Sequence, residues 1–191
     1  EGRNDPDLFW VDPKFRGIFP LGNYHISRSL GRRICQENYE IRINSAFPDV
    51  VQTCAERSET WISTRIFNLY CELAKLGHAH SLEVWQKGSM AGGVYGLTIG
   101  AAFFGESMFS KQTDGSKIAL AYLIHRLKHT GFKLFDTQFI TPHLQSLGAV
   151  EISRADYHKK LRHALRNNGD FLNRDYSVDA SDIAQRKTQT S

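Results

Sequence analysis

The stretch MAGGVYGLTIGAAFFGESMF (residues 90–109) is apolar and rich in glycine, and it decides the predicted fold. It is too long for one ordinary strand, so we divide it near Gly100 into two predicted strands. The next segment, SKIALAYLIHRLKH (residues 116–129), predicts a helix because its apolar residues recur at helical spacing. That apolar stripe is Leu120, Leu123, Ile124 and Leu127. FKLFDTQF (residues 132–139) predicts one more strand, which completes a strand–helix–strand crossover.

Periodicity and turn signals predict further elements on both sides of this crossover. They are a strand over 39–45, a helix over 48–56, a helix over 66–77, a strand over 80–84 with a turn at Lys87-Gly88, and helices over 141–147 and 153–167. Asp114 or Ser116 is expected to cap the start of the long helix, and Ser153 with Asp156 forms a capping box for the last one.

This order of elements predicts an α/β (α+β) fold with a mixed, largely antiparallel sheet flanked by helices, which fits an acyltransferase-like domain over 40–167. Residues 1–39 hold prolines and glycines without a clear period, and we expect an irregular arm packed on that domain. Residues 168–191 are polar and aperiodic, and we expect a disordered tail.

Composition narrows the class of protein. The 191 residues contain no run of about 18 apolar residues, so we expect no membrane partner. The number of cysteines is odd, and none of them forms a Cys-x-x-Cys pair: they are Cys35, Cys54 and Cys71. This pattern disfavours a disulfide framework or a zinc ribbon, and it indicates a cytoplasmic protein. A net charge of +4 permits a polyanionic partner without requiring one.

Several motifs occur in an order that resembles one known family. They are HISRS (25–29), TWI (60–62), GHAHSLEVW (77–85), GGVYG (92–96), FGESMFS (104–110) and FDTQF (135–139). In register from about Phe9 to Leu165, they resemble the leucyl/phenylalanyl-tRNA–protein transferases. The family has more chain ahead of the segment that is Trp10-Val-Asp-Pro13 in this sequence, and the tail after about residue 167 has no family counterpart that we can place.

The resemblance implies a GNAT-like domain that transfers Leu or Phe, and less well Met, from aminoacyl-tRNA. The implied acceptors are proteins that begin with Arg or Lys, which then enter the bacterial N-end-rule degradation route in the cytoplasm. No cofactor, ATP, metal or coenzyme A is implied, because the aminoacyl ester is already activated.

Three polar residues are the predicted catalytic group. Asp136 and Gln138 lie two apart on a predicted strand, so we expect them to face the same way, about 7 Å apart. By resemblance, Gln138 takes part in activating the attacking amine and Asp136 supports it in a proton relay. Glu106 lies among apolar residues, where a carboxylate is costly to bury unless it is paired. By resemblance, it holds the amino group of the substrate.

Apolar and aromatic residues are the predicted binding groups. Val94, Phe103 and Met108 alternate with glycines on strands and are expected to line the aminoacyl pocket, and Val94 stands where the family often has Met. By resemblance, Trp61 and Trp10 stack on the 3′-terminal adenosine of tRNA, an interaction worth roughly 1–3 kcal/mol per base.

Two basic clusters are predicted to contact tRNA phosphates. One is Arg28, Arg32 and Arg33; the other, on the last helix, is Lys159, Lys160 and Arg162, with His163 and Arg166 nearby. A charged helix face can also be merely solvated. A true phosphate contact would weaken as salt rises.

Other functions remain open from the sequence. A coenzyme A-dependent acetyltransferase would share the fold, but Ser110–Lys117 has one glycine where pyrophosphate binding needs several. A non-catalytic tRNA-binding protein would have lost the polar residues on the strands. His78-x-His80 suggests a metal pair, but no third ligand lies at a useful spacing.

Overall fold

A single mixed sheet is the frame of the molecule. The computed structural model describes residues 11–22, 24–36, 38–57 and 60–184. Within these residues the sheet has seven strands in the order β2-β3-β4-β5-β6-β1-β7. The strands are β1 (Phe15–Ile18), β2 (Glu40–Ile43), β3 (Ala79–Gln86), β4 (Ser89–Ile99), β5 (Ala102–Ser110), β6 (Leu134–Gln138) and β7 (Val150–Ser153).

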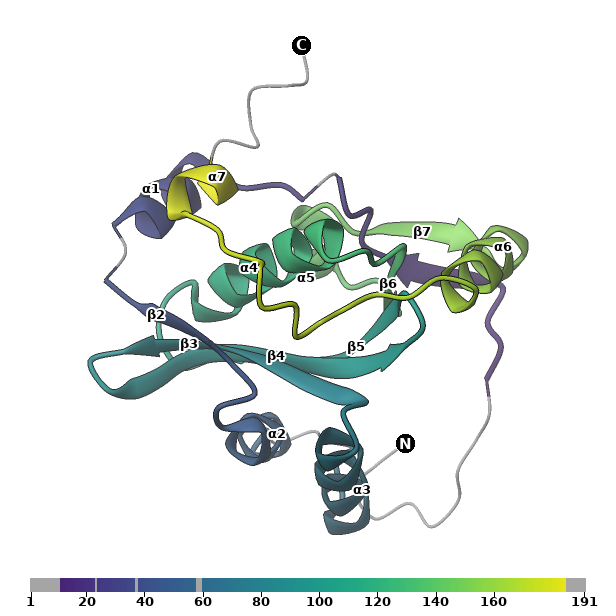
Figure 1. Cartoon of the computed structure of the whole chain (residues 1–191), viewed down its shortest axis with the longest axis horizontal. Helices are drawn as coiled ribbons and strands as arrows, with labels where there is room; N and C mark the ends of the chain where they lie inside the picture. Colours follow the sequence, from purple (N-terminus) through teal and green to yellow (C-terminus); the bar gives the residue numbers. More distant parts are fainter. Residues whose placement is uncertain (1–10, 23, 37, 58–59, 185–191) are drawn as a thin grey trace.

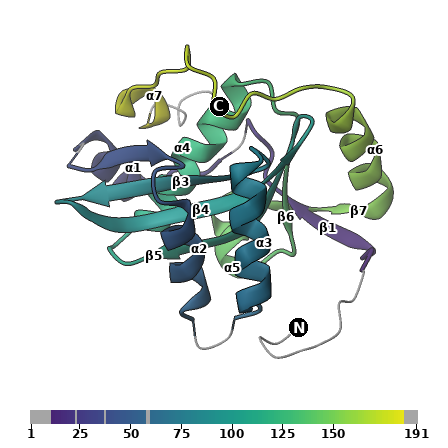
Figure 2. The same cartoon turned by 60° about the horizontal axis from the view of Figure 1, so that its bottom comes forward.

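Helices cover both faces of this sheet. They are α1 (Arg28–Cys35), α2 (Phe47–Ala55), α3 (Thr64–Lys75), α4 (Gly115–His129), α5 (Pro142–Ser146), α6 (Arg154–Leu165) and α7 (Ala180–Ala184). Figures 1 and 2 show α4 against one face and α2 with α3 against the other. The predicted sheet with flanking helices is therefore confirmed. No helix in the described ranges combines the length and apolar character needed to cross a membrane.

Strand pairing creates an opening in the middle of the sheet. β5 and β6 run parallel and are joined by the α4 crossover, as predicted, whereas the other neighbouring strands run antiparallel. The parallel pair is short, because its register ends at Phe104 opposite Asp136. Both strands continue past that point, β5 to Ser110 and β6 to Gln138, without pairing to each other. The sheet is thus divided there.

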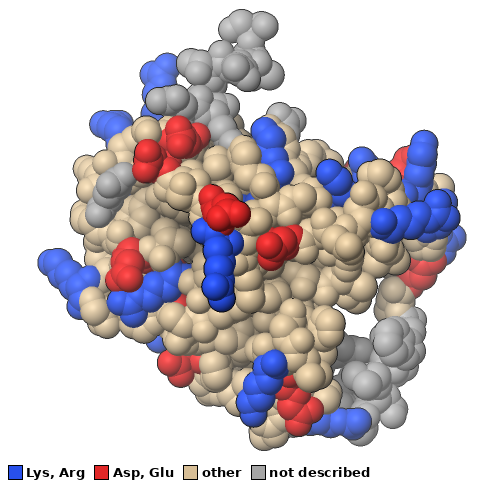
Figure 3. Space-filling model, in the orientation of Figure 1, with Lys and Arg blue, Asp and Glu red and all other residues tan. Residues whose placement is uncertain are grey.

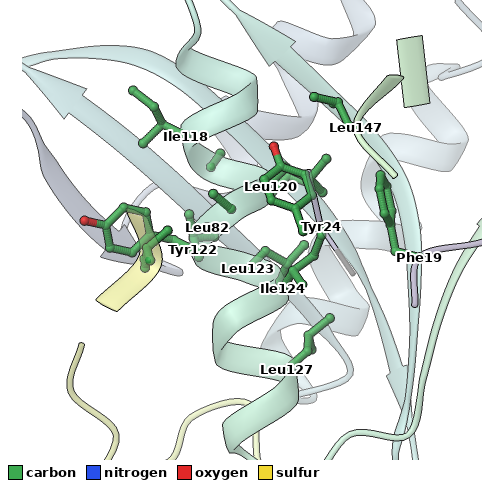
Figure 4. Packing of buried hydrophobic residues seen from close by; sticks show 14 of the residues in the cluster. Phe19, Tyr24, Leu82, Ile118, Leu120, Tyr122, Leu123, Ile124, Leu127 and Leu147 are labelled. Atoms are coloured by element: carbon green, nitrogen blue, oxygen red, sulfur yellow. The ribbon is translucent and has the colours of Figure 1, made fainter. Parts of the chain in front are cut away.

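The larger core lies between α4 and the sheet (Figure 4). The predicted stripe of α4 is buried, with Leu123, Ile124 and Leu127 fully shielded from solvent. Burial of such side chains contributes roughly 1.5–3 kcal/mol each. Two glycines allow α4 to begin directly on the sheet, because a Cβ on Gly115 would overlap the backbone of Ala91 and Gly92. α4 is therefore held tightly against β4.

The prediction of an irregular arm over residues 1–39 is wrong for two segments. β1 lies inside the sheet, between β6 and β7, and α1 packs against α7 and α4. β1 has only four residues, FRGI, and its partners lie more than 100 residues further along the chain. Such a strand is stabilised by long-range pairing rather than by a local pattern, so periodicity could not reveal it.

The prediction of a disordered tail after residue 167 is wrong for residues 168–184. Phe171, Ala180 and Ile183 are at most 3% exposed and belong to the α4 core. The Phe171 ring stacks on His80 at 4.4 Å and on Phe103 at 5.6 Å between centroids. The apolar residues of this segment do not recur at a helix or strand spacing, so no periodicity marked the ones that are buried.

The start of α4 also differs from the prediction. Asp114 occupies the N-cap position, but its φ is +64° and its side chain makes no capping hydrogen bond. Its carboxylate instead pairs with Arg33 at 3.2 Å and Lys117 at 2.9 Å. The N–H of Ser116 donates to the hydroxyl of Ser110. Asp114 thus ties α1 to the start of α4 rather than capping it.

Candidate active site

A cavity of about 490 Å³ occupies the opening between β5 and β6. Its lining comes from β4, β5, β6, the start of α4, the end of α2 and α5. Apolar side chains supply one part, including Phe19, Val94, Met108, Leu120 and Phe135. Glu106, Ser107 and Gln138 supply a polar part. An apolar hollow with a few convergent polar groups is the usual form of a small-molecule site.

Glu106 enters this cavity because of a β-bulge. Tyr95 of β4 lies opposite Ser107, and Gly96 lies opposite Gly105, so Glu106 is the extra residue on β5. A bulge leaves its extra residue out of the ladder and redirects the side chain. The bulge also reverses the alternation of β5. Phe103 and Met108, an odd number of residues apart, therefore both face α4.

The carboxylate of Glu106 is largely withdrawn from water. The Nε2 of Gln138 donates to its Oε2 at 3.1 Å, and the Tyr70 hydroxyl of α3 is a second hydrogen-bond partner. Burial raises the pKa of Glu106 above its ordinary value, although both hydrogen bonds act in the opposite direction. A desolvated carboxylate is poised to bind a cation, because an ammonium would restore the electrostatic stabilisation that water no longer provides.

Gln138 is held in an unusual backbone conformation at the end of β6. Its φ is +63°, in the left-handed region that non-glycine residues rarely adopt. Such a conformation costs of order 1–3 kcal/mol and persists only where surrounding contacts impose it. The turn brings the Gln138 side chain into the cavity beside Glu106, so both polar residues reach the site through a break in regular strand geometry.

Asp136 does not face the cavity, and the prediction that it shares a face with Gln138 is wrong. Asp136 is fully buried, and its carboxylate accepts from Arg16 Nε at 3.0 Å, Arg16 Nη2 at 2.9 Å and the Tyr157 hydroxyl at 2.6 Å. It also accepts from the backbone N–H of Gln138 at 2.7 Å. The left-handed turn breaks the strand alternation on which the prediction relied. Asp136 holds Gln138 from behind.

Two of the three predicted pocket residues line the cavity. Val94 and Met108 do so, from opposite positions on β4 and β5. Phe103 does not; it is 1% exposed and lies edge-on to Phe135 and stacked on Phe171. Phe103 therefore supports the cavity wall from behind, through Phe135.

Of the two residues predicted to stack on adenosine, the structure describes only Trp61. Trp61 is partly buried in the cluster between the sheet and α3, with its ring edge-on to Tyr70 at 6.1 Å. It does not line the cavity, but Tyr70 connects it to Glu106. Trp10 lies outside the described residues.

The first basic cluster is carried by α1. Arg28, Arg32 and Arg33 are all exposed. Arg33 is engaged with Asp114 and donates to the carbonyl of Thr113 at 3.2 Å, so part of its charge is neutralised. Thr113 and Asp114 belong to the loop between Ser110 and Ser116, two residues that line the cavity. α1 thus places Arg33 near one rim of the site.

The second basic cluster is carried by α6, where lysines and arginines gather in Figure 3. Lys159, Lys160 and Arg162 are exposed. A groove of about 410 Å³ is lined by the basic residues Lys133, Lys159, Lys160 and His163, together with Ile152 and Asp156. Arg162 is not among the residues that line the groove. Lys133 joins the groove from the segment before β6, and no sequence pattern indicated that it would.

Several cavity residues were absent from the sequence predictions. Arg57 follows α2 and donates to the carbonyl of Met108. His143 of α5 and the exposed Phe139 line the side opposite β5. Tyr70, which lies within the helix predicted over 66–77, is a partner of Glu106. Each lies in an element whose place beside the cavity depends on tertiary packing, and no local signal marks it.

The arrangement suits acyl transfer to an amine. The apolar part can take a small hydrophobic side chain, and the buried carboxylate can take its ammonium group. The amide of Gln138 is placed to orient a second polar group. Among the described residues, no cluster of three or more His, Cys, Asp or Glu is arranged to hold a metal ion.

Comparisons with known proteins point to one family. The family model described as leucyl/phenylalanyl-tRNA protein transferase matches residues 18–162. The chain is 56% identical over 191 residues to the protein of that name from Cereibacter sphaeroides strain KD131, covering 100% of this chain and 89% of the relative. It is 57% identical over 191 residues to the one from Ruegeria pomeroyi, covering 100% and 90%.

Similarity to solved structures is weaker. A structure described as L-PGS from Bacillus licheniformis is 15% identical, with a TM-score of 0.42, and the match covers 70% of this chain and 52% of that chain. A score below 0.5 carries no argument about fold or function. The residues of the cavity, by contrast, lie within the range that the family model matches.

Proposed function

Because this chain belongs to the leucyl/phenylalanyl-tRNA protein transferase family, we propose how its cavity moves an amino acid from tRNA to protein. The enzyme is an aminoacyltransferase, which replaces the alternative of a coenzyme A-dependent acetyltransferase. It takes leucine or phenylalanine from aminoacyl-tRNA and joins it to a protein. The observation that supports the mechanism best is the contact between Gln138 and Glu106 at the divided sheet.

The donor amino acid occupies the cavity. Its side chain lies against Val94, Met108 and Leu120, and its α-ammonium binds the carboxylate of Glu106. The apolar lining supports a preference for apolar side chains such as those of Leu and Phe, and we propose that Met is accepted less well. A polar side chain would leave its hydrogen-bonding groups unpaired there, at a cost of about 1–3 kcal/mol.

Gln138 orients the attacking amine. Its Nε2 donates to Glu106, so its Oε1 is the group left to accept an N–H from the acceptor. An amine held in this way points its lone pair at the ester carbonyl. Such orientation lowers the barrier, because the translational and rotational entropy of the amine has already been lost on binding.

Asp136 is a positioning residue in this mechanism. Its bond to the N–H of Gln138 stabilises the left-handed turn, and Arg16 and Tyr157 fix the carboxylate itself. We assign Asp136 this structural role in place of the expected proton relay; the support is that this fully buried group lies behind the cavity and does not line it.

The tRNA lies across the rim of the cavity. Phosphates contact Arg28 and Arg32 of α1, with Arg33 contributing beside Asp114, and more distant phosphates contact Lys159, Lys160 and Arg162 of α6. Trp61 and Trp10 are proposed to stack on the terminal adenosine. For Trp61 the support is its contact with Tyr70, which places it one side chain away from Glu106.

The finer biological assignment is proposed on the same basis. The domain is GNAT-like, supported by the β5–α4–β6 crossover and the divided sheet. Its acceptors begin with Arg or Lys, and the modified proteins enter N-end-rule degradation in the cytoplasm.

A transfer assay tests this function. The protein is mixed with leucyl- or phenylalanyl-tRNA and with peptides that differ only in beginning with Arg, Lys, Asp or Glu. We expect transfer to the Arg and Lys peptides, and none to the same peptides after N-terminal acetylation. Transfer to the acidic peptides, or to none of the peptides, would contradict the proposed acceptors.

A further inference from the structure

Transfer to an amine requires a group that can hold a proton. Once a neutral amine attacks the ester, its nitrogen becomes positive and must lose one proton before the new bond is stable. The leaving ribose oxygen must gain one. A side chain that alternately accepts and donates at neutral pH typically contributes about 10²–10⁴-fold to such a reaction.

The residues already placed in the mechanism do not supply that group. An amide such as that of Gln138 accepts a hydrogen bond but does not bind a proton at neutral pH. Asp136 is fully buried behind the cavity and engaged by Arg16, Tyr157 and the N–H of Gln138. Glu106 is occupied by the ammonium of the donor, which neutralises it.

One imidazole remains at the cavity. Among the described lining residues, the titratable or charged side chains are Arg57 from the end of α2, Glu106 of β5 and His143 of α5. His143 is exposed at the side where α5 borders the opening. In the described part of the chain, its ring makes no hydrogen bond; only its backbone carbonyl is engaged, by the hydroxyl of Ser146. The ring is therefore available to a ligand.

We propose that His143 is a catalytic residue that shuttles the proton between the attacking amine and the ribose oxygen. This inference rests on the proposed function and deepens it. α5 starts four residues after Gln138, so His143 and the amide that orients the amine border the same side of the cavity. An imidazole is the side chain whose ordinary pKa lies closest to neutral pH, as a shuttle requires.

The step balances without another reactant. The acceptor first loses one proton to solvent and becomes a neutral amine. Its nitrogen forms a bond to the ester carbon, and one N–H proton passes to neutral His143. The carbon–oxygen bond to the ribose then breaks, and the protonated imidazole returns that proton to the leaving oxygen. A peptide bond and a free tRNA hydroxyl result, and His143 is again neutral.

Single-turnover kinetics test the proposal. His143→Ala should lower the rate of transfer from leucyl-tRNA to an Arg-starting peptide by about 10²-fold or more, with the Kd for leucyl-tRNA little changed. The pH–rate profile of the variant should retain only the ionisation that belongs to the α-amine of the peptide. His78→Ala, at an exposed position remote from the cavity, should behave as wild type.

Chemical rescue separates proton transfer from a structural role. Free imidazole should restore transfer by the His143→Ala protein, and methyl-substituted imidazoles of higher pKa should restore it faster. A structural role predicts no dependence on the pKa of the added base. Full activity of His143→Ala, or lost activity that no imidazole restores, would overturn the proposal.

The wild-type reaction separates this inference from the function on which it rests. If the wild-type protein transfers no amino acid from either tRNA, the proposed function fails. If wild type is active and His143→Ala is equally active at every pH, only the role of His143 fails.

Discussion

At the scale of single residues, the site is built where regular geometry is interrupted. Glu106 is the extra residue of a bulge, and Gln138 adopts a left-handed backbone with φ of +63°. Asp136 stabilises the left-handed turn by accepting a hydrogen bond from the N–H of Gln138. Tyr70 and Gln138 are the hydrogen-bond partners of the Glu106 carboxylate at the bulge. Local stability is thus reduced in order to fix two polar groups in contact.

Two variants of Gln138 separate its amide from its backbone. Both Gln138→Ala and Gln138→Gly should lower the transfer rate by about 10²-fold, because both remove a polar group that acts at the reaction centre. tRNA binding should change little, which filter binding checks. The Gln138→Gly protein should also have a free energy of unfolding roughly 1–2 kcal/mol higher than that of Gln138→Ala, since glycine adopts positive φ without strain. Equal reductions in transfer and tRNA binding would argue against a catalytic role.

Glu106→Gln should lower activity and raise stability. Burial raises the folded-state pKa of Glu106, so the folded protein binds this proton more tightly than the unfolded chain. Stability is therefore lost as pH rises through that pKa, and the neutral variant should melt higher than wild type at pH 7, by about 2–4 °C per kcal/mol.

The melting advantage of Glu106→Gln should disappear below the pKa of Glu106, and its transfer activity should be low throughout. A lower melting temperature than wild type at pH 7 would show that the carboxylate stabilises the fold and would remove the argument that it is kept for function.

At the scale of elements, the sequence predicts the helices and strands that are marked by a local pattern of apolar, capping or turn residues. α2, α3, α4 and α6 have apolar stripes or caps, and the β3–β4 hairpin has Lys87-Gly88 at its turn, with both residues at positive φ. β1 and β7 are four residues long and exist because they pair with each other and, for β1, with β6. Only the folded chain contains that information.

Part of the site, like part of the fold, could be predicted from the sequence. Glu106, Gln138, Val94 and Met108 converge on one cavity. The orientation of Asp136 could not be predicted, because no sequence pattern shows that a glutamine takes a left-handed conformation. His143 and Arg57 were missed because no sequence pattern shows that the start of α5 and the end of α2 border the cavity.

The contact between α4 and β4 can be tested through its glycines. Gly115→Ala should destabilise the protein by about 1–3 kcal/mol, because the new methyl group would overlap the backbone of Ala91 and α4 would have to move outward. Denaturant unfolding measures this change. Gly22→Ala is the matched control, since a Cβ there meets nothing within 4 Å, and its effect should stay within about 0.5 kcal/mol. Similar values for the two variants would refute the close contact.

At the scale of the whole molecule, the C-terminal segment closes the core. Phe171 is 3% exposed, and Arg126 of α4 donates to its carbonyl at 3.0 Å. The neighbouring Leu172 is 52% exposed. The segment therefore belongs to the fold, although its apolar residues follow no helix or strand period.

Adjacent residues provide the test of this closure. Phe171→Ala should cost about 3–5 kcal/mol of unfolding free energy, because it leaves a cavity between His80 and Phe103. Leu172→Ala should change it by no more than about 0.5 kcal/mol. Equal small effects in denaturant unfolding would show that residues 168–184 are dispensable.

The positive charge of α1 is proposed to contribute to tRNA binding through contacts with phosphates. Arg28→Glu with Arg32→Glu should weaken tRNA binding and reduce the slope of log K against log salt by roughly 0.7–0.9 for each phosphate that the protein no longer neutralises. Arg33→Glu should have an additional stability cost, because it would face Asp114. Lys75→Glu, on α3, should leave the slope unchanged. An unchanged slope in the double variant would reject α1 as a phosphate-binding element.

The position of β1 between β6 and β7 has a consequence for synthesis. Among the strands of the described residues β1 is synthesised first, but both of its neighbours emerge more than 100 residues later. Throughout that interval the nascent strand exposes unsatisfied amide and carbonyl groups, which attract other strands. β6 and β7 must therefore be synthesised before this part of the sheet can form, and a product that stops short of them would keep β1 without its partner strands.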